Sequence, residues 1–113
     1  MEDLAKKKCK PCEGGVAPLT EEQAKRMMNL LHENWSLDKG AAYIERYFEF
    51  AAFSRTIAFV NAVAFIATNE GHHPDLSVSY GNCNVRYRTH AINGLSENDF
   101  ICAAKIDRLA EEL

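Results

Sequence analysis

Three of the four histidines of this 113-residue chain, His72, His73 and His90, lie within nineteen residues of one another. Imidazole is the side chain whose unperturbed pKa, about 6.5, lets it donate or accept a proton near neutral pH. A reaction that removes one proton and delivers another can use two such groups. We therefore expect an active site in the stretch from Glu70 to Asp99. This stretch also carries the turn, carboxylate and aromatic residues that can hold a flat polar ligand: Pro74, Asp75, Tyr80 and Asp99.

A proline follows the two adjacent histidines. Pro74 excludes a continuing helix and biases His73 toward an extended backbone, so we expect the rings of His72 and His73 to point in different directions. One ring would then face a substrate while the other orients it. The alternative is that both histidines only cap the preceding helix and contact its last carbonyl groups.

The other candidates also have simpler explanations. His90 falls on the polar side of an expected strand, where a plain surface residue fits the pattern equally well. Asp99 follows Ser96 by three positions, so helix capping and the helix dipole already explain an acid there. A three-histidine zinc site is disfavoured, because adjacent histidines rarely converge on one metal and no acid stands at helical spacing to them. We expect no metal in this stretch.

Local patterns predict the elements that position these residues. Capping boxes begin helices at Thr20 and Ser96, and the first helix has an apolar face that runs on to Trp35. Period-two alternation predicts one hairpin around Lys39-Gly40 and a second, with strands 76–80 and 84–90, around Gly81-Asn82. With a helix over 53–70 between them, the order αββαββα predicts an α+β fold: a four-stranded antiparallel sheet with three helices packed on one face.

The helix expected over 53–70 is apolar around most of its circumference. Its only polar stripe is narrow and consists of Ser54, Asn61 and Thr68. A helix that is buried on one side and solvated on the other does not have this pattern. We therefore expect a homodimer or homotetramer with this helix at the interface, the alternative being an unusually apolar surface helix.

Length and composition narrow the classes of function. A chain of 113 residues supports one domain, and we expect a mobile leader over 1–18 followed by a single domain over 19–113. The net charge of -3 provides no basic field, which disfavours direct binding of nucleic acid. The longest apolar run, 56–67, is shorter than the roughly 20 residues of a membrane span, so we expect no membrane insertion.

The four cysteines are too few and too scattered for a disulfide scaffold, and no apolar signal segment precedes them. We therefore expect a reduced, cytoplasmic protein. Cys9 and Cys12 have the two-residue spacing of zinc and redox motifs, but neither a second ligand pair nor a strand-to-helix setting accompanies them. A metal or redox role for this pair remains an alternative.

The spacing of His72-His73-Pro74, Tyr80, His90 and Asp99 resembles the signature of the pterin-4a-carbinolamine dehydratases, a family also known as a dimerisation cofactor of a homeodomain transcription factor. The resemblance extends from about Leu19 to the C-terminus. One position departs from the pattern, because Thr68 stands where the family usually has a charged residue, often Glu.

The resemblance implies an enzyme that dehydrates 4a-hydroxytetrahydropterin to the quinonoid dihydropterin in tetrahydropterin recycling, without a metal or organic cofactor. It implies His72 and His90 as the acid and base, unassigned between them, and His73 as a pterin-binding residue. Pro74, Asp75 and Asp99 would shape the site, with Tyr80 packing near it. It also implies dimers or tetramers. The alternative function is a non-catalytic protein-binding module, a transcriptional coactivator or assembly factor that uses the surface of helix 53–70.

Overall fold

The computed structural model describes residues 3–11 and 14–112. The sequence predicts three helices and four strands, and these are present in the predicted order. The elements are η1 (Leu4–Lys6), α1 (Glu21–Met28), β1 (Ser36–Leu37), β2 (Ile44–Glu49), α2 (Phe53–Glu70), β3 (Asp75–Ser79), β4 (Asn82–Tyr87), η2 (His90–Ile92) and α3 (Glu97–Glu111).

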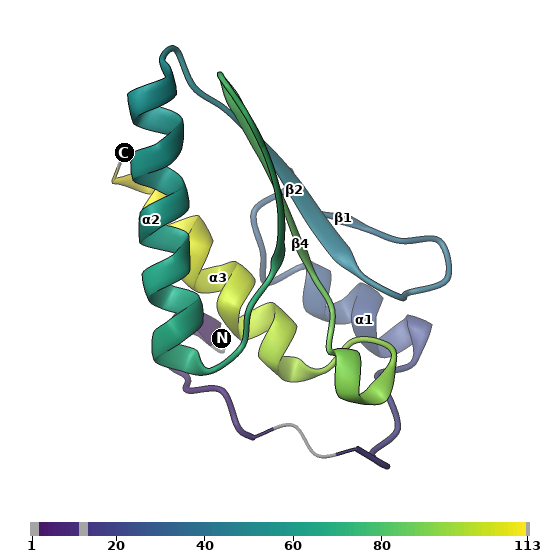
Figure 1. The fold of residues 1–113 in the computed structure, drawn as a ribbon. Helices are drawn as coiled ribbons and strands as arrows, with labels where there is room; N and C mark the ends of the chain where they lie inside the picture. Colours follow the sequence, from purple (N-terminus) through teal and green to yellow (C-terminus); the bar gives the residue numbers. More distant parts are fainter. Residues whose placement is uncertain (1–2, 12–13, 113) are drawn as a thin grey trace.

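The four strands form one antiparallel sheet in the order β1-β2-β4-β3. Alternation along β4 turns Cys83, Val85 and Tyr87 into the core, while Asn84 and Arg86 lie on the open face of the sheet. Helices α2 and α3 lie together on the other face (Figure 1). The predicted α+β architecture, with the helices on one face of the sheet, is confirmed.

Helix α3 passes through the centre of the molecule. Its residues 98–104 are all buried, and α2 packs on the core through a stripe with helical spacing: Thr56, Phe59, Val63 and Ala67. The predicted capping at both helix starts is confirmed. The amide of Thr20 donates to Gln23, and the amide of Ser96 donates to Asp99. Asp99 is therefore both a capping residue and a buried one.

The first helix ends earlier than the apolar pattern predicts. It stops at Met28, and Trp35 enters the core from a separate loop, where its Nε1 donates to Asp107 at 2.6 Å. The tertiary contact with α3 thus accounts for Trp35, which helical spacing had assigned to the helix. Among the described residues, no helix is long and apolar enough to cross a bilayer.

The second hairpin also differs in detail from its predicted form. Its turn lies at Tyr80-Gly81, because Asn82 already pairs with Ser79. A side chain at Gly81 would place its Cβ 2.9 Å from the carbonyl oxygen of Phe50. Strand β4 ends at Tyr87, so the prediction that the strand continues to His90 is wrong.

The chain leaves the sheet after Arg88 because residues 89–94 form a tight loop. The amide of Thr89 donates to Gly94 at 2.7 Å, and Asn93 adopts the left-handed conformation with a φ of 51°. Between these points His90 begins the short helix η2. His90 therefore stands at the end of the sheet instead of on its polar face.

Within the predicted leader, residues 3–11 pack on α3. Leu4 is buried in the core, Lys105 donates to the carbonyl of Ala5 at 2.8 Å, and Lys7 pairs with Glu97 at 3.0 Å. This segment therefore makes specific contacts with the domain.

Candidate active site

The C-terminal end of α2 delivers the two adjacent histidines. Gly71 takes the left-handed conformation with a φ of 66°, and its amide donates to Thr68 while the amide of His72 donates to Ala67 at 3.0 Å. This backbone arrangement closes the helix with its last carbonyls satisfied. The cap is thus made by main-chain groups, and the imidazole of His72 makes a different contact.

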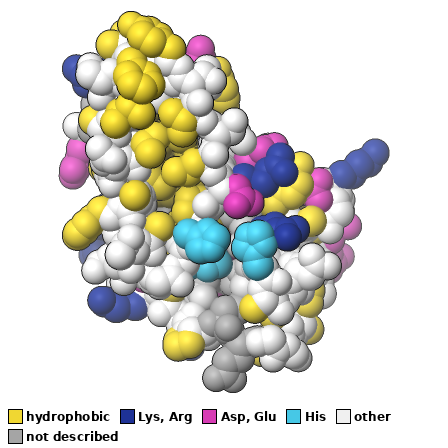
Figure 2. All heavy atoms as spheres, viewed as in Figure 1, with side chains coloured by type: hydrophobic (Ala, Val, Ile, Leu, Met, Phe, Trp, Pro, Cys, Tyr) yellow, Lys and Arg dark blue, Asp and Glu magenta, His cyan; other side chains and the backbone are white. Residues whose placement is uncertain are grey.

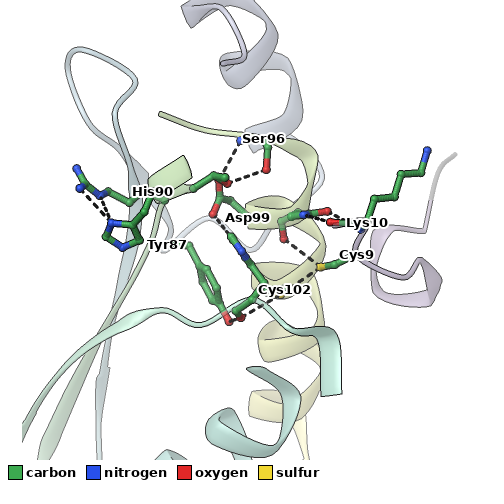
Figure 3. A network of polar contacts seen from close by, with 11 residues as sticks. Cys9, Lys10, Tyr87, His90, Ser96, Asp99 and Cys102 are labelled. Atoms are coloured by element: carbon green, nitrogen blue, oxygen red, sulfur yellow. Dashed lines mark hydrogen bonds and ion pairs between the residues drawn. The ribbon is translucent and has the colours of Figure 1, made fainter. Parts of the chain in front are cut away.

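The ring of His72 turns inward. Its Nε2 lies 2.6 Å from Oδ1 of Asp99, and the side chain is only 11% exposed. One face of the ring stacks on Tyr87, with ring centroids 5.3 Å apart, and the hydroxyl of Tyr87 donates to the His72 carbonyl. Figure 3 shows Tyr87 and Asp99, the two side chains that hold His72. His72 is therefore held at its ring and at its backbone.

Asp99 is fully buried, and both of its carboxylate oxygens have partners. Oδ1 faces His72, whereas Oδ2 accepts from the hydroxyl of Thr89 at 2.7 Å and from the amide of Ser96 at 2.9 Å (Figure 3). Such partners compensate a carboxylate for the water it loses on burial. The contact between Ser96 and Asp99 is the predicted capping box, whereas the role of Thr89 was not predicted. Inward alternation after Val85 and Tyr87 was the available signal for Thr89.

The contact with Asp99 changes the proton affinity of His72. Burial alone would lower the pKa of the imidazole, but the hydrogen bond and the negative charge of Asp99 outweigh it and raise the pKa above its usual value. The charged imidazolium is therefore favoured. Because Nε2 is engaged by Asp99, Nδ1 is the ring atom left for proton exchange with a ligand.

His73 and His90 lie on the outside of the same region. Their rings are stacked, with centroids 5.9 Å apart and planes at 24°. Nδ1 of His90 lies 3.3 Å from Nε and 3.1 Å from Nη2 of Arg88. A guanidinium can only donate, so Nδ1 accepts and the proton of the neutral His90 ring lies on Nε2. The predicted divergence of the adjacent rings is confirmed, since His72 points inward and His73 outward.

The three histidines surround a shallow hollow of about 170 Å³, lined by Gly71, His72, His73, Arg88, Thr89, His90 and Ala91. Figure 2 shows the histidines side by side on the surface, next to arginine or lysine and acidic side chains. A flat ring cannot enter between His73 and His90, because two stacking contacts of about 3.5 Å each need roughly 7 Å. A planar ligand would instead lie across the edges of the two rings.

A second hollow of about 330 Å³ begins two residues after His73 and is lined by Asp75, Leu76, Ser77, Asn84 and Arg86. Arg86 lies opposite Asp75 in the register of β3 and β4. The side chains of Asn84, Arg86 and Arg88 follow one another at two-residue spacing, so this row leads along the open sheet face toward His90. The two hollows together provide a polar surface with histidines at one end.

Not every predicted site residue joins this cluster. Pro74 and Asp75 directly follow His73, but Tyr80 lies at the other end of β3, about 20 Å along the chain from Pro74 at strand spacing. The ring of Tyr80 stacks on Phe53 with centroids 6.0 Å apart. Within one chain, the structure thus brings together the three histidines and Asp99, with Asp75 nearby. Tyr80 lies away from this group.

Two further positions at the end of α2 lie outside the cluster. Thr68, where the resembling family usually has a charged residue, is exposed. Glu70 turns toward the N-terminal segment, where it accepts from the amide of Cys9 at 2.8 Å and lies 3.7 Å from Lys105. No carboxylate of α2 therefore tunes the histidines in the way that Asp99 does.

Within residues 3–11 and 14–112, no three His, Cys, Asp or Glu side chains are grouped to hold a metal ion. Cys12 lies outside the described residues, and with it the interpretation of Cys9 and Cys12 as a metal or redox motif. A hollow of about 430 Å³ between β2 and α2 is lined by no histidine. The three histidines are instead gathered at the smaller hollow.

Comparisons with known proteins show the family. Residues 17–109 match the family model described as Pterin 4 alpha carbinolamine dehydratase. A Nitrosomonas eutropha protein named "Putative pterin-4-alpha-carbinolamine dehydratase" is 55% identical over 107 residues, which are 95% of this chain and 93% of the relative. A Legionella pneumophila (strain Lens) protein of the same name is 51% identical over 107 residues, 95% of each chain.

Solved structures show the same fold. A Brucella melitensis crystal structure of a "transcriptional coactivator/pterin dehydratase" superimposes with a TM-score of 0.76 at 31% identity, covering 82% of this chain and 98% of that one. A pterin dehydratase-like protein described as a RuBisCO assembly factor in the alpha-carboxysome superimposes with a TM-score of 0.60 at 24% identity, covering 70% and 92%. The second likeness concerns the fold alone.

Proposed function

Because the chain belongs to the pterin 4 alpha carbinolamine dehydratase family, we propose that it is a hydro-lyase that converts 4a-hydroxytetrahydropterin to the quinonoid dihydropterin in tetrahydropterin recycling. The observation that carries the proposal is the hollow shared by three histidines held in two different ways. His72 is buried against Asp99, whereas His73 and His90 are stacked on the outside.

The proposed reaction needs only proton transfer. The bond between C4a and the hydroxyl oxygen breaks, and the oxygen takes up a proton and leaves as water. N5 of the pterin loses its proton, and the electron pair left on N5 forms the new double bond to C4a. One proton is delivered and one is removed, which two imidazoles can do at neutral pH.

We assign the two proton transfers to His72 and His90, without fixing which is acid and which is base. The raised pKa of His72 keeps a proton available, and the contact from Arg88 sets the tautomer of His90. Asp99 acts as a positioning residue, because it holds the ring of His72 and favours its charged form. His73 packs against the ligand beside His90.

Asp75 is suited to bind the other end of the pterin. The pyrimidine ring of a pterin presents the N3 proton and the 2-amino group side by side, and a carboxylate accepts two such parallel donors. Asp75 is exposed at the start of β3 and follows Pro74, which fixes the backbone after His73. Replacing Asp75 with Asn should therefore raise KM more than it lowers kcat.

The test is the dehydration of chemically generated 4a-carbinolamine. The wild-type protein should accelerate it over buffer, and His90→Ala should lower kcat/KM by roughly 100-fold or more. His32→Ala is the matched control, because His32 is exposed and contacts Asn34 away from the hollow. A carbinolamine that decays equally fast with protein and in buffer would contradict the enzymatic function.

A protein-binding function is favoured by a separate observation. Large exposed apolar side chains gather on the outer face of α2 and on the adjoining β3 hairpin (Figure 2). We call this the outer apolar surface and define it by Phe53, Phe65, Leu76, Val78 and Tyr80, of which Phe65 is 71% exposed. The solved Brucella relative carries "transcriptional coactivator" in its description. We propose that this surface mediates a homodimer or homotetramer, or a partner protein, independently of the histidines.

A further inference from the structure

Cys9 and Cys102 are two thiols that the proposed dehydration does not use. Their Sγ atoms lie 3.5 Å apart, although 93 residues separate them along the chain. Cys102 is fully buried in α3, whereas Cys9 is half-buried and so reachable from solvent. Figure 3 shows Cys102 between Tyr87 and Cys9, and Cys102 also lies 3.9 Å from the carbonyl of His72.

The position of Cys9 is set by contacts on both of its sides. Its amide donates to Glu70 at 2.8 Å. The next residue, Lys10, forms a two-way pair with Asn98: its amide donates to Oδ1 at 3.0 Å, and its carbonyl accepts from Nδ2 at 2.6 Å. Asn98 belongs to the same turn of α3 as Cys102. The backbone that carries Cys9 is therefore docked on the helix that carries Cys102.

The remaining gap between the sulfurs is short. A disulfide has an S–S distance of about 2.05 Å, so the two Sγ atoms must approach by roughly 1.5 Å. Rotation of the Cys9 side chain with a small shift of the docked segment supplies such a movement. We propose that Cys9 and Cys102 are a reversible redox pair, which small-molecule disulfides such as oxidised glutathione convert into an intrachain disulfide.

The proposed oxidation is two successive thiol–disulfide exchanges. The Cys9 thiolate attacks one sulfur of the small disulfide, and the other sulfur leaves as a thiolate and takes up a proton. The Cys102 thiolate then attacks Sγ of Cys9 in the mixed disulfide and expels the second small thiol. The two cysteines lose two electrons and two protons, and the small disulfide gains them as two thiols.

The local electrostatics fit this order of steps. The hydrogen bonds with Cys9 and Tyr87 and the positive charge of His72 lower the pKa of Cys102. Once Cys9 is in the mixed disulfide, Tyr87 and His72 remain to favour the second attack. The hydrogen bond with Cys102 and burial raise the pKa of Cys9, so the first step is slow until the segment opens to solvent. The pair would therefore respond to sustained oxidation and not to brief exposure.

The bond would join residues 3–11 to α3 and close a long loop. Restricting the unfolded chain in this way stabilises the folded state, so we expect the oxidised protein to melt on the order of 10 °C higher than the reduced one. Dithiothreitol should reverse the shift. The disulfide leaves the imidazoles of His72, His73 and His90 covalently unaltered. Cys102 contacts His72 at the backbone carbonyl.

The experiment uses the full chain, incubated under native conditions with oxidised glutathione and then alkylated. Before alkylation, the intact mass should fall by about 2 Da, and digestion of the alkylated sample should release one peptide pair joined through Cys9 and Cys102. Cys12→Ser and Cys83→Ser are the matched controls and should still form this bond, whereas Cys9→Ser should not. A bridge between Cys9 and Cys12, a stable glutathione adduct on Cys9, or unreacted Cys102 would each overturn the proposal.

Discussion

The histidine cluster and the outer apolar surface lie along the same helix, α2, but differ in how their side chains find partners. In the cluster, the buried carboxylate of Asp99 accepts from His72, Thr89 and Ser96, all from the same chain. On the outer surface, Phe65 is 71% exposed and Tyr80 is 68% exposed. The contacts of Asp99 are made within one chain, whereas Phe65 and Tyr80 are left largely uncovered by the described residues.

This difference fits the two proposed functions, which have separate requirements. Proton transfer needs rings held at fixed positions, which a satisfied internal network provides. An exposed apolar area gains about 25 cal/mol per Å² when another molecule covers it. The adjoining strand β3 is also at the edge of the sheet, where strands present unpaired backbone groups. Catalysis and association should therefore respond to different substitutions.

The largest effect is expected for Asp99→Asn. The side-chain amide of Asn cannot accept from His72, Thr89 and Ser96 together, and its NH₂ group places a donor next to these donors. We therefore expect a loss of about 3 kcal/mol in the free energy of unfolding. Because His72 loses its anchor, the dehydration rate should fall roughly 100-fold. Denaturant titration and the carbinolamine assay measure the two effects.

Asp107→Asn is the matched control for this substitution. Asp107 accepts from Trp35, Arg46 and the amide of His32, but it lies eight residues, or about 12 Å, farther along α3. Asp107→Asn should lower the free energy of unfolding to a similar extent as Asp99→Asn, while the folded protein keeps its dehydration rate. Equal losses of activity in the two variants would show that Asp99 acts on folding alone.

The next effect concerns the outer apolar surface. Phe65→Glu puts a charge at its most exposed residue, so the assembly should dissociate toward monomers, with less than a threefold change in dehydration rate per chain. Sedimentation velocity measures the assembly. Asn34→Glu adds the same charge at an exposed site away from α2 and should leave the assembly intact. If Phe65→Glu sediments as the wild type does, helix α2 is not the interface.

A smaller effect is expected from pH. The folded-state pKa of His72 is raised, so its pairing with Asp99 stabilises the protein fully below the unfolded pKa of about 6.5 and loses this contribution as the pH rises through the folded value. The difference in unfolding free energy between wild type and His72→Gln should thus be larger at about pH 5.5 than at about pH 9. A difference that grows with pH would mean that His72 is held as the neutral imidazole.

The smallest effect on catalysis is expected for Tyr80→Ala. Tyr80 stacks on Phe53 at the far end of β3, so within one chain it does not reach the histidine hollow, and KM should stay within about twofold of wild type. Steady-state kinetics on the same pterin measures this. A clear rise in KM would mean that Tyr80 meets the substrate from a second copy of the chain.

Several features of the fold could be predicted because they depend on neighbours along the chain. The capping residues Thr20 and Ser96 and the apolar period of 53–70 each need only a few adjacent positions, and all appear in the structure. The divergence of His72 and His73 follows from Pro74 for the same reason. Local sequence therefore determined the order of elements and placed His72 and His73 at the end of one helix.

The contacts that give the site its chemistry join distant residues, and only packing could decide them. His72 meets Asp99 across 27 positions, because α3 passes beneath the end of α2. Arg88 reaches His90 because the loop to Gly94 turns the chain out of β4. Cys9 meets Cys102 because the N-terminal segment docks on α3. Sequence spacing carries no information on such approaches, since they depend on how separate elements share one core.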